Sequence, residues 1–385
     1  MSHEKKKYLV LYCEDWNTNL ITSKHHFIER LAKENNEILY LEVPFNIFSY
    51  ISKPSEYFNR NHLNLFRGLR KVKENIWVLK LFVPIPYHPI LGVITDNLFV
   101  NFINQKFILI FLKLYLKRIN FFNYEAIIYY PMIYPVIKSL KFDKIHFHIV
   151  DDWQGFKGIP KTMLQMTKKL ASHADSVIVS SSNLMKKYKK YNKNIKLLRH
   201  GTDPEIFNQG INLAINSKEN VKVGYYGSLE KLDFKLIKNV SMVLSSWNFY
   251  FLGPLTPNVR KEIKSIERDN VTFLNPIQRK KLPSFLKTIN VFFMPFKINQ
   301  LTKSMTPIKV YEVLNFGLPI VSVDLDEIKF ITKKYILFSN DKEIIIKNLI
   351  KAVQTDSVKK KKKRIQFVKP YSWDNRFKIF KKIIN

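Results

Sequence analysis

A lysine and a glutamate three residues apart, Lys309 and Glu312, are the side chains of this sequence that point most directly to a chemistry. They lie in residues 306–321, TPIKVYEVLNFGLPIV. On a helix, residues at this spacing share a face one turn apart. A lysine in the first turn can neutralise phosphate oxygens, and a carboxylate one turn deeper can accept hydrogen bonds from two hydroxyl groups. The pair therefore predicts a site for the diphosphate and ribose of a nucleotide. The alternative is an exposed ion pair on an ordinary amphipathic helix.

The residues around this pair predict a helix followed by a strand. Thr306 is suited to cap the helix and Pro307 to its first position, whereas Gly317 fits the left-handed C-terminal position and Pro319 prevents continuation. A strand is expected at residues 320–323. A helix N-terminus at the edge of a parallel sheet offers free N–H groups and a positive dipole end, which suits it to bind a diphosphate.

The same segment resembles the donor-site motif of bacterial GT-B glycosyltransferases, family 1/4-like, P-x-K-x-x-E-x-x-x-x-G-x-P-V-V. The resemblance is carried by Pro307, Lys309, Glu312, Gly317, Pro319, Ile320 and Val321. Four further segments stand in the order that this family would place them: residues 199–207, RHGTDPEIF; 223–229, VGYYGSL; 249–254, FYFLGP; and 271–296, which ends INVFFMPF. The resemblance covers about residues 195–325 well and the N-terminal half only loosely.

This resemblance implies an α/β fold of the GT-B class, with two Rossmann-like domains facing each other across a cleft. The donor-binding residues that it implies are Lys309, Glu312, Gly227, Ser228, Pro307, Tyr311 and Pro276. Many retaining family 4 enzymes have a second glutamate eight residues before the ribose-binding one, and here that position is Ser304. The departure favours a branch that resembles glucuronosyltransferases and teichuronic-acid-type transferases.

Two adjacent carboxylates, Asp151 and Asp152, follow an apolar run at residues 145–150 that predicts a buried strand. The carboxyl ends of parallel strands are where open α/β sheets bind ligands. A transferase that inverts the sugar needs a general base for the acceptor hydroxyl, and a carboxylate suits that task. We expect one of the two to be the base, with Asp152 preferred. The alternative is that an aspartate here caps the following loop or helix.

The segment after the first expected strand, residues 13–32, supplies the candidate acceptor-binding side chains. These are Glu14, Asp15, Trp16, His25 and His26. The stretch is similar to one in relatives that binds the acceptor or closes over the donor. Glu14 and Asp15 compete with the two aspartates for the role of base, and the sequence does not decide between them. At least one of the histidines is expected to be packed or solvated rather than catalytic.

Short apolar runs alternate with helical patterns along the chain, which predicts βα units and mainly parallel sheets. In the first half, strands are expected at residues 8–13, 37–43, 76–82, 126–130, 145–150, 176–180 and 195–198. In the second half, they are expected at residues 221–226, 249–252, 271–274, 291–294, 320–323 and 336–338. Residues 201–220 lack a sustained period and predict a connection. The expected domains are 1–203 for the acceptor, 204–369 for the donor, and a C-terminal helix at 370–385 that returns to the first domain.

The charge of the chain is its most unusual bulk property. In 385 residues, 64 Lys and Arg oppose 31 Asp and Glu, a formal net charge of +33. Such a field favours a polyanionic partner such as an anionic membrane surface or nucleic acid, although AT-rich coding would also raise the lysine content. Residues 97–120 predict a long apolar helix with basic residues, either interfacial or packed in the first domain. The lysine run at residues 359–364 predicts a solvated helix end.

Cys13 is the single cysteine of the sequence, which excludes an internal disulfide and favours a reducing compartment. The N-terminus does not have the pattern of a signal peptide, and no apolar run reaches the ~18 residues of a membrane span. We therefore expect a cytoplasmic protein, peripheral on the inner face of the cell membrane.

The expected activity is the metal-independent transfer of a sugar from a nucleotide-sugar donor, with a UDP-sugar preferred. The expected acceptor is a saccharide or a polyprenyl-diphosphate-linked molecule in cell-surface polysaccharide synthesis. No cofactor, metal or nucleic acid is expected, because the sequence shows neither metal-ligand spacing nor a nucleic-acid-binding module. The alternatives are a nucleotide-sugar 2-epimerase of the same fold and a basic nucleic-acid-binding protein.

Overall fold

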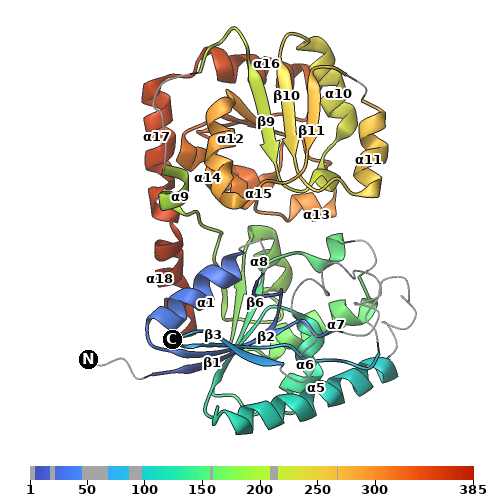
Figure 1. Ribbon diagram of the computed structural model, residues 1–385, viewed down its shortest axis with the longest axis vertical. Helices are drawn as coiled ribbons and strands as arrows, with labels where there is room; N and C mark the ends of the chain where they lie inside the picture. Colours follow the sequence, from blue (N-terminus) through green and yellow to red (C-terminus); the bar gives the residue numbers. More distant parts are fainter. Residues whose placement is uncertain are drawn as a thin grey trace. The chain divides into compact units, whose positions relative to one another are not determined.

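The computed structural model describes residues 5–17, 22–45, 68–85, 98–156, 159–208, 216–266 and 268–385, with residues 98–100 described by their backbone. By its internal contacts the chain divides into two compact units. Unit 1 contains Met1–Leu198 and Phe377–Asn385, and unit 2 contains Arg199–Arg376. Each unit is built around a sheet with helices on both faces (Figure 1).

In the described part of unit 1, eight strands form a sheet in the order β3-β4-β2-β1-β5-β6-β7-β8. The strands are β1 (Lys7–Cys13), β2 (Glu37–Glu42), β3 (Leu69–Lys73), β4 (Ile76–Leu79), β5 (Glu125–Ile128), β6 (Ile145–Ile149), β7 (Ser176–Val179) and β8 (Ile195–Leu197). All pairs are parallel except β3 with β4. The chain runs outwards from β1 and later returns to β5 on its other side. The switch point of this sheet, where ligands bind in open α/β folds, therefore lies between β1 and β5.

Two groups of helices cover the sheet of unit 1. The helices are α1 (Ser23–Lys33), α5 (Leu98–Arg118), α6 (Tyr134–Ile137), α7 (Lys161–His173), α8 (Ser182–Tyr188) and, from residue 377 onwards, α18 (Trp373–Ile384). Helix α5 contacts α6, which contacts α7. Helices α1 and α18 are joined by Phe27 and Phe380, whose stacked rings have centroids 4.5 Å apart. This contact ties the end of the chain to unit 1.

Unit 2 has a six-stranded parallel sheet in the order β11-β10-β9-β12-β13-β14, as far as its residues are described. The strands are β9 (Lys222–Tyr226), β10 (Asn248–Leu252), β11 (Val271–Leu274), β12 (Val291–Met294), β13 (Ile320–Ser322) and β14 (Ile336–Phe338). The chain proceeds outwards from β9 to β11 and then crosses back to β12. The switch point of this sheet therefore lies between β9 and β12.

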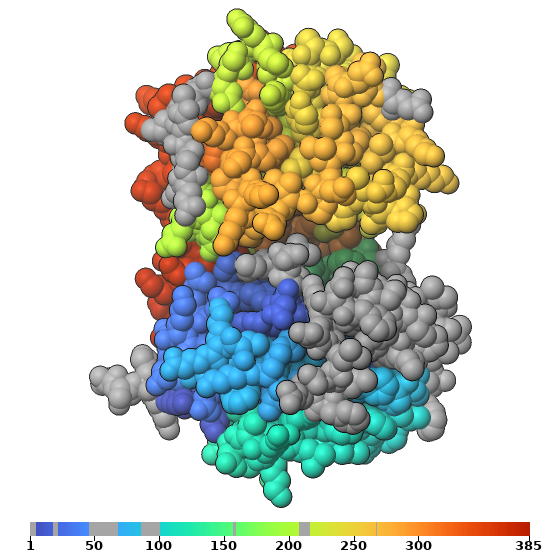
Figure 2. Space-filling model, viewed as in Figure 1, coloured from blue at the N-terminus to red at the C-terminus, as the bar shows by residue number. Residues whose placement is uncertain are grey.

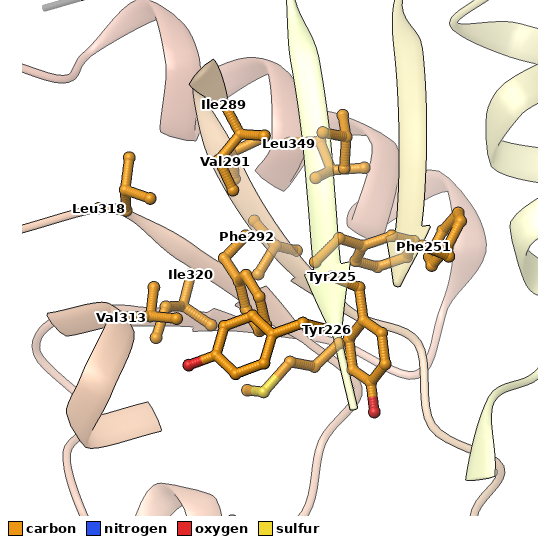
Figure 3. Close-up of a cluster of buried hydrophobic side chains, with 14 of the residues drawn as sticks. Tyr225, Tyr226, Phe251, Ile289, Val291, Phe292, Val313, Leu318, Ile320 and Leu349 are labelled. Carbon is orange, nitrogen blue, oxygen red and sulfur yellow. The ribbon is translucent and has the colours of Figure 1, made fainter. Parts of the chain in front are cut away.

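The helices of unit 2 form two layers. They are α9 (Pro204–Asn208), α10 (Phe234–Val243), α11 (Pro257–Lys264), α12 (Leu282–Thr288), α13 (Gln300–Lys303), α14 (Ile308–Phe316), α15 (Asp326–Lys329), α16 (Lys342–Gln354) and α17 (Val358–Val368). Helix α14 contacts α9, α12 and α17, whereas α10 contacts α16. The core between the layers is rich in aromatic rings: Tyr225 of β9 stacks on Phe292 of β12 at 5.7 Å, and Val313 of α14 belongs to the same cluster of buried side chains (Figure 3).

The predicted α/β fold class is confirmed, and each predicted strand is present with its ends within a few residues of the expected ones. The sequence missed β3, the antiparallel strand LRKVK, because its largely charged residues lack an apolar pattern. It also missed the short helix α9 in the segment expected to be a connection.

The first unit ends at Leu198 in the sequence, whereas the sequence predicted a first domain that ends at residue 203. The backbone N–H of Thr202 donates to the Tyr371 carbonyl at 2.9 Å, and the N–H of Trp373 donates to the Thr202 carbonyl at 3.0 Å. This pairing, with the Arg199–Glu327 and Arg279–Asp203 ion pairs, joins residues 199–203 to unit 2. The expected C-terminal helix begins at Trp373, and only its part from Phe377 belongs to unit 1.

The lysine run at residues 359–364 differs from its prediction. It forms most of α17, which packs on α14, and two of its members, Lys361 and Arg364, are buried. Arg364 donates from Nε to the Gly317 carbonyl at 2.7 Å, and its Nη2 lies 2.5 Å from Asp356 Oδ1. A cation at a helix C-terminus satisfies a free carbonyl and complements the helix dipole. Arg364 therefore anchors the C-terminal end of α14, and the N-terminal end of that helix is left to other contacts.

Candidate active site

Helix α14 begins at the carboxyl end of the sheet of unit 2, beside its switch point. Pro307 is the residue before the helix rather than its first residue, and no side chain caps this end among the described residues. At the other end Gly317 has φ +84°, the left-handed conformation that the sequence predicted. The first backbone N–H groups of a helix lack partners within the helix, so this N-terminus suits an anion.

Lys309 lies in a partly buried position over two aromatic rings. Its Nζ is 5.3 Å from the ring centroid of Tyr225 and 5.8 Å from that of Phe296. Burial and, to a lesser extent, the nearby charge of Lys231 lower the pKa of Lys309 to about 8, whereas Glu312 opposes the shift. Burial and a neighbouring lysine together disfavour the charged form of Lys309 despite Glu312, and a bound phosphate would favour that form. Lys231 was missed because no local pattern distinguishes it from the other lysines.

Gly227 follows β9 with φ +133°, a conformation that other residues rarely adopt. A Cβ added here would lie 2.7 Å from Lys309 Nζ. A Cβ on Gly253, after β10, would lie 2.0 Å from the Gly227 carbonyl oxygen. The loop after β9 therefore needs glycine for both its conformation and its packing. The next residue, Ser228, accepts a hydrogen bond from the Tyr225 hydroxyl on its carbonyl at 3.2 Å.

Glu312 is buried, and its two oxygens have different neighbours. Oε2 accepts a hydrogen bond from the Tyr226 hydroxyl at 2.6 Å, and Oε1 lies 2.7 Å from Arg279 Nη2. The same Arg279 atom is 3.2 Å from Asp203 Oδ2. Burial and the Glu312 carboxylate raise the pKa of Tyr226, so its hydroxyl remains protonated and donates. The alternative of an exposed Lys309–Glu312 surface pair is therefore excluded.

The structure thus brings Lys309, Glu312 and Gly227 together at one end of one sheet, but it places two other predicted donor residues differently. Tyr311 is fully buried with its ring 5.1 Å from that of Tyr371, on another face of α14. Pro276 is exposed in the loop after β11, three residues before Arg279. The sequence did not single out Arg279, Tyr226 or Asp203, because they lie 33, 86 and 109 residues away from Glu312.

The candidate base residues of unit 1 follow β6. Asp152 is buried and caps the 3-10 turn Trp153–Gly155, accepting a hydrogen bond from the Gln154 N–H at 3.3 Å. Its Oδ1 also lies 2.5 Å from Lys187 Nζ. The capping role that the sequence left open for one of the two aspartates therefore falls on Asp152. Asp151 is partly exposed. The assignment of the base to either of them stays a prediction.

Three of the candidate acceptor residues gather where β1 ends, at the switch point of unit 1. Glu14 accepts hydrogen bonds from the Thr22 hydroxyl and from Lys24, and the Nδ1 atom of His25 lies 3.8 Å from its Oε1. The indole of Trp16 packs on the rings of His25, at 5.5 Å, and Tyr40, at 5.0 Å. These contacts form one connected cluster.

The pKa values of Glu14 and His25 in this cluster are both lowered, but for different reasons. Burial acts to raise the pKa of Glu14, but Lys24 and the hydrogen bonds outweigh it and hold the pKa below its usual value. Burial lowers the pKa of His25, so its ring is neutral near pH 7. Asp15 lies outside this cluster, 3.3 Å from Lys80 Nζ. His26 is buried with its Nδ1 3.4 Å from Arg30 Nη1.

Comparisons with known proteins bear on the family of the second half of the chain and on the fold of the whole. Residues 220–355 match the family described as Glycosyl transferases group 1. This segment contains Tyr226, Gly227, Arg279, Lys309 and Glu312, which we call the donor cluster, whereas Asp203 precedes it. Unit 2 therefore carries a group 1 glycosyltransferase domain, and the predicted family resemblance is confirmed.

A curated glycosyltransferase is similar in sequence to part of this chain. The putative teichuronic acid biosynthesis glycosyltransferase TuaH of Bacillus subtilis (strain 168) is 24% identical over 223 residues, which are 53% of this chain and 56% of that protein. The match thus spans about half the length of the curated relative, and it agrees with the predicted teichuronic-acid-type branch.

Solved structures show the fold of the whole chain. A sucrose-phosphate synthase from Thermosynechococcus elongatus aligns over 99% of this chain and 98% of its own, with a TM-score of 0.73 and 12% identity. A trehalose-6-phosphate structure from E. coli bound with UDP-2-fluoro glucose aligns over 98% of both chains, with a TM-score of 0.71 and 10% identity. The fold is therefore GT-B, as predicted.

Proposed function

We propose that this protein transfers a sugar from a nucleotide-sugar donor to a saccharide or lipid-linked acceptor in cell-surface polysaccharide synthesis. The observation that carries the proposal is the cluster of Lys309, Glu312 and Gly227 at the switch point of a group 1 glycosyltransferase domain. The bound UDP-2-fluoro glucose of a structural relative supports UDP as the nucleotide. The teichuronic acid relative supports a role in envelope polysaccharide.

In this proposal the two parts of the cluster hold different parts of the donor. The N-terminus of α14 and Lys309 hold the diphosphate, which the Gly227 backbone approaches closely because no side chain intervenes. Glu312 accepts hydrogen bonds from the ribose hydroxyls. Arg279 is a positioning residue, because it acts on the donor through the Glu312 carboxylate.

The chemistry follows from this arrangement. If the anomeric centre is inverted, a base takes the proton of the acceptor hydroxyl, whose oxygen then attacks the anomeric carbon. The bond from that carbon to the diphosphate breaks, and Lys309 and the helix N-terminus stabilise the negative charge that develops on the leaving nucleotide. In this proposal Lys309 and the N-terminus of α14 supply the positive charge that a divalent metal ion would otherwise supply to the leaving nucleotide. Asp152 is the proposed base, and Asp151, Glu14 and Asp15 remain its competitors.

We also propose that the protein works in the cytoplasm, at the inner face of the cell membrane, on an acceptor carried by a polyprenyl diphosphate. A net charge of +33 supports attraction to anionic lipid. Among the residues that the structure describes, no helix is both long and apolar enough to cross a bilayer. Contact with the membrane would accordingly be peripheral.

A panel of UDP-, GDP- and CMP-sugars tests the proposal directly, with binding measured by calorimetry on the purified protein. We expect one class of nucleotide sugar to bind and, when the acceptor is supplied, to release its nucleotide. The Glu312→Ala variant should raise the donor KM by at least about ten-fold, because two hydrogen bonds to a charged group are lost. Glu312→Gln reports the same loss with less disturbance of Arg279. Glu343→Ala, at an exposed carboxylate on α16, is the matched control.

Failure of every nucleotide sugar to bind would overturn the proposal. An unchanged KM in both Glu312 variants would refute the ribose role alone. The two alternatives predicted from the sequence, the 2-epimerase and the nucleic-acid-binding protein, are not supported by the comparisons. An epimerase would convert the donor sugar without needing an acceptor, and the same assay distinguishes it.

A further inference from the structure

Helix α5 carries large apolar side chains on its outer face and amides on its inner one. Its outward residues include Phe107, Ile110, Phe111 and Leu114, which are 39%, 56%, 41% and 58% exposed. We call these four residues the apolar strip. At about 100° per residue they occupy one side of the helix, over roughly a quarter of its circumference. Scattered apolar residues are normal on a protein surface, but a contiguous set on one helix marks an interaction site.

Hydrogen bonds on the inner face fix this rotation of the helix. Asn104 donates from Nδ2 to the Ile85 carbonyl at 2.8 Å and accepts from the Ile85 N–H at 3.1 Å. Gln105 donates to the Met132 carbonyl at 2.6 Å. A turn of α5 that buried the apolar strip would break all three bonds and leave buried amide groups unpaired, which is costly. Below these amides, Ile108 and Leu112 pack into the core of unit 1.

A row of lysines borders the apolar strip. Lys106, Lys113 and Lys117 are exposed and lie beside the strip along the helix, and we call them the basic edge. The teal region of Figure 2, which contains α5, lies at the surface of unit 1. Lysine stems can lie along an apolar boundary while their ammonium groups reach phosphates, so this exposed face, apolar with a basic border, suits contact with anionic lipid headgroups.

We infer that α5 is the surface by which this protein docks on an anionic lipid bilayer. The apolar strip enters the boundary between headgroups and acyl chains, and the basic edge contacts lipid phosphates. A bilayer fits better than a second copy docked through the same helix, because residues 98–118 contain no acidic residue that could pair with the basic edge of the other copy, whereas anionic lipid supplies phosphates. The inference extends the membrane part of the proposed function to named residues, but it does not depend on the sugar or the nucleotide.

Vesicle co-sedimentation of the full chain tests this inference, with vesicles of phosphatidylcholine alone and of phosphatidylcholine with phosphatidylglycerol at about 7:3. The wild-type protein should bind the anionic vesicles and be released by salt. The variant K106Q/K113Q/K117Q should lose about five-fold in partition coefficient for each lysine. The variant F107Q/I110Q/F111Q should lose at least about ten-fold. Both sets of side chains are exposed, so the melting temperature should stay close to that of the wild type.

Matched controls lie in unit 2. The variant K359Q/K362Q/K363Q removes three exposed lysines from α17, and M242Q/V243Q/I344Q removes three exposed apolar residues from α10 and α16. The inference is overturned if wild type fails to bind anionic vesicles, or if the control variants lose as much binding as the α5 variants. Self-association in solution that F107Q/I110Q/F111Q abolishes would also overturn it, in favour of a second copy. Calorimetry with UDP on the same proteins shows separately whether the donor site is intact.

Discussion

Lys309 offers the sharpest test of the donor site, because its charge should change within the working pH range. Burial and Lys231 lower its pKa to about 8 in the free protein, against an ordinary value of 10.5. Bound phosphate would favour the charged form and raise this pKa again, so binding should take up a proton near pH 8.5. If only the charged form holds the diphosphate well, the Kd for UDP should rise by about ten-fold between pH 7 and pH 9.

Two substitutions separate charge from packing at this position. Lys309→Met removes the charge-assisted bonds, worth about 1.5–3 kcal/mol, and should weaken UDP binding by about 10- to 150-fold at pH 7. It should also abolish the pH dependence. Lys309→Arg keeps a charge that does not titrate in this range, so its Kd should be nearly flat from pH 7 to pH 9.

Isothermal titration calorimetry with UDP measures both the affinity and the proton uptake, when it is repeated in buffers of different ionisation enthalpy. Lys351→Met, at an exposed lysine on α16, is the control and should keep the wild-type affinity and pH dependence. A wild-type Kd that stays constant from pH 7 to pH 9 would refute the role of a half-buried titrating lysine. A folded Lys309→Met protein that binds UDP as tightly as wild type would refute the phosphate role itself.

Three further predictions concern the surroundings of the site. Gly227→Ala should weaken UDP binding by at least about ten-fold and destabilise unit 2 by about 1–3 kcal/mol, since the new Cβ meets Lys309 Nζ at a strained φ; calorimetry and urea unfolding measure the two effects. Arg364→Met should cost about 3 kcal/mol in urea unfolding, because it strips Asp356 and the end of α14 of their partner, and an unchanged midpoint would contradict this. Burial, aided by the charge of Arg199, lowers the pKa of His200 to about 4, so the unfolded chain binds more protons below pH 6.5. Stability should therefore fall by about 3 kcal/mol as the pH falls from 6.5 to 4, and His200→Gln should lose this dependence.

The strands and α14 could be predicted because their signals are local. Apolar runs of four to six residues, with proline and glycine at their ends, specify βα units without knowledge of distant contacts. The Lys309–Glu312 pair was found for the same reason, since three residues fix both side chains on one helical face. Strand β3 lacked such a signal, because a charged edge strand is held by its partner β4 rather than by its own pattern.

The remaining half of the donor cluster could not be predicted from spacing. Arg279 is one of four basic residues among residues 279–287, and nothing in that stretch indicates which of them reaches a carboxylate. The fold brings it to Glu312, just as it brings Tyr226 from the end of β9. The ion pair of Asp152 with Lys187 could not be predicted either, because the two residues are 35 positions apart in the sequence. The preference for Asp152 as base was therefore made without knowledge of this partner.

The basic residues of α17 fall into two groups, four exposed and two buried, and the two groups should differ in how freely they can be substituted during evolution. A coding bias towards AT-rich codons would favour lysine throughout residues 359–364, and the run looks uniform in composition. Four of its positions face solvent and should accept almost any helix-forming residue. Positions 361 and 364 are buried against the end of α14 and should be restricted, with arginine retained at 364 because lysine lacks the forked geometry that reaches Gly317 and Asp356 together. Tolerance to substitution along α17 should therefore vary with a period of about three residues, because the buried positions are needed to hold α14 in place.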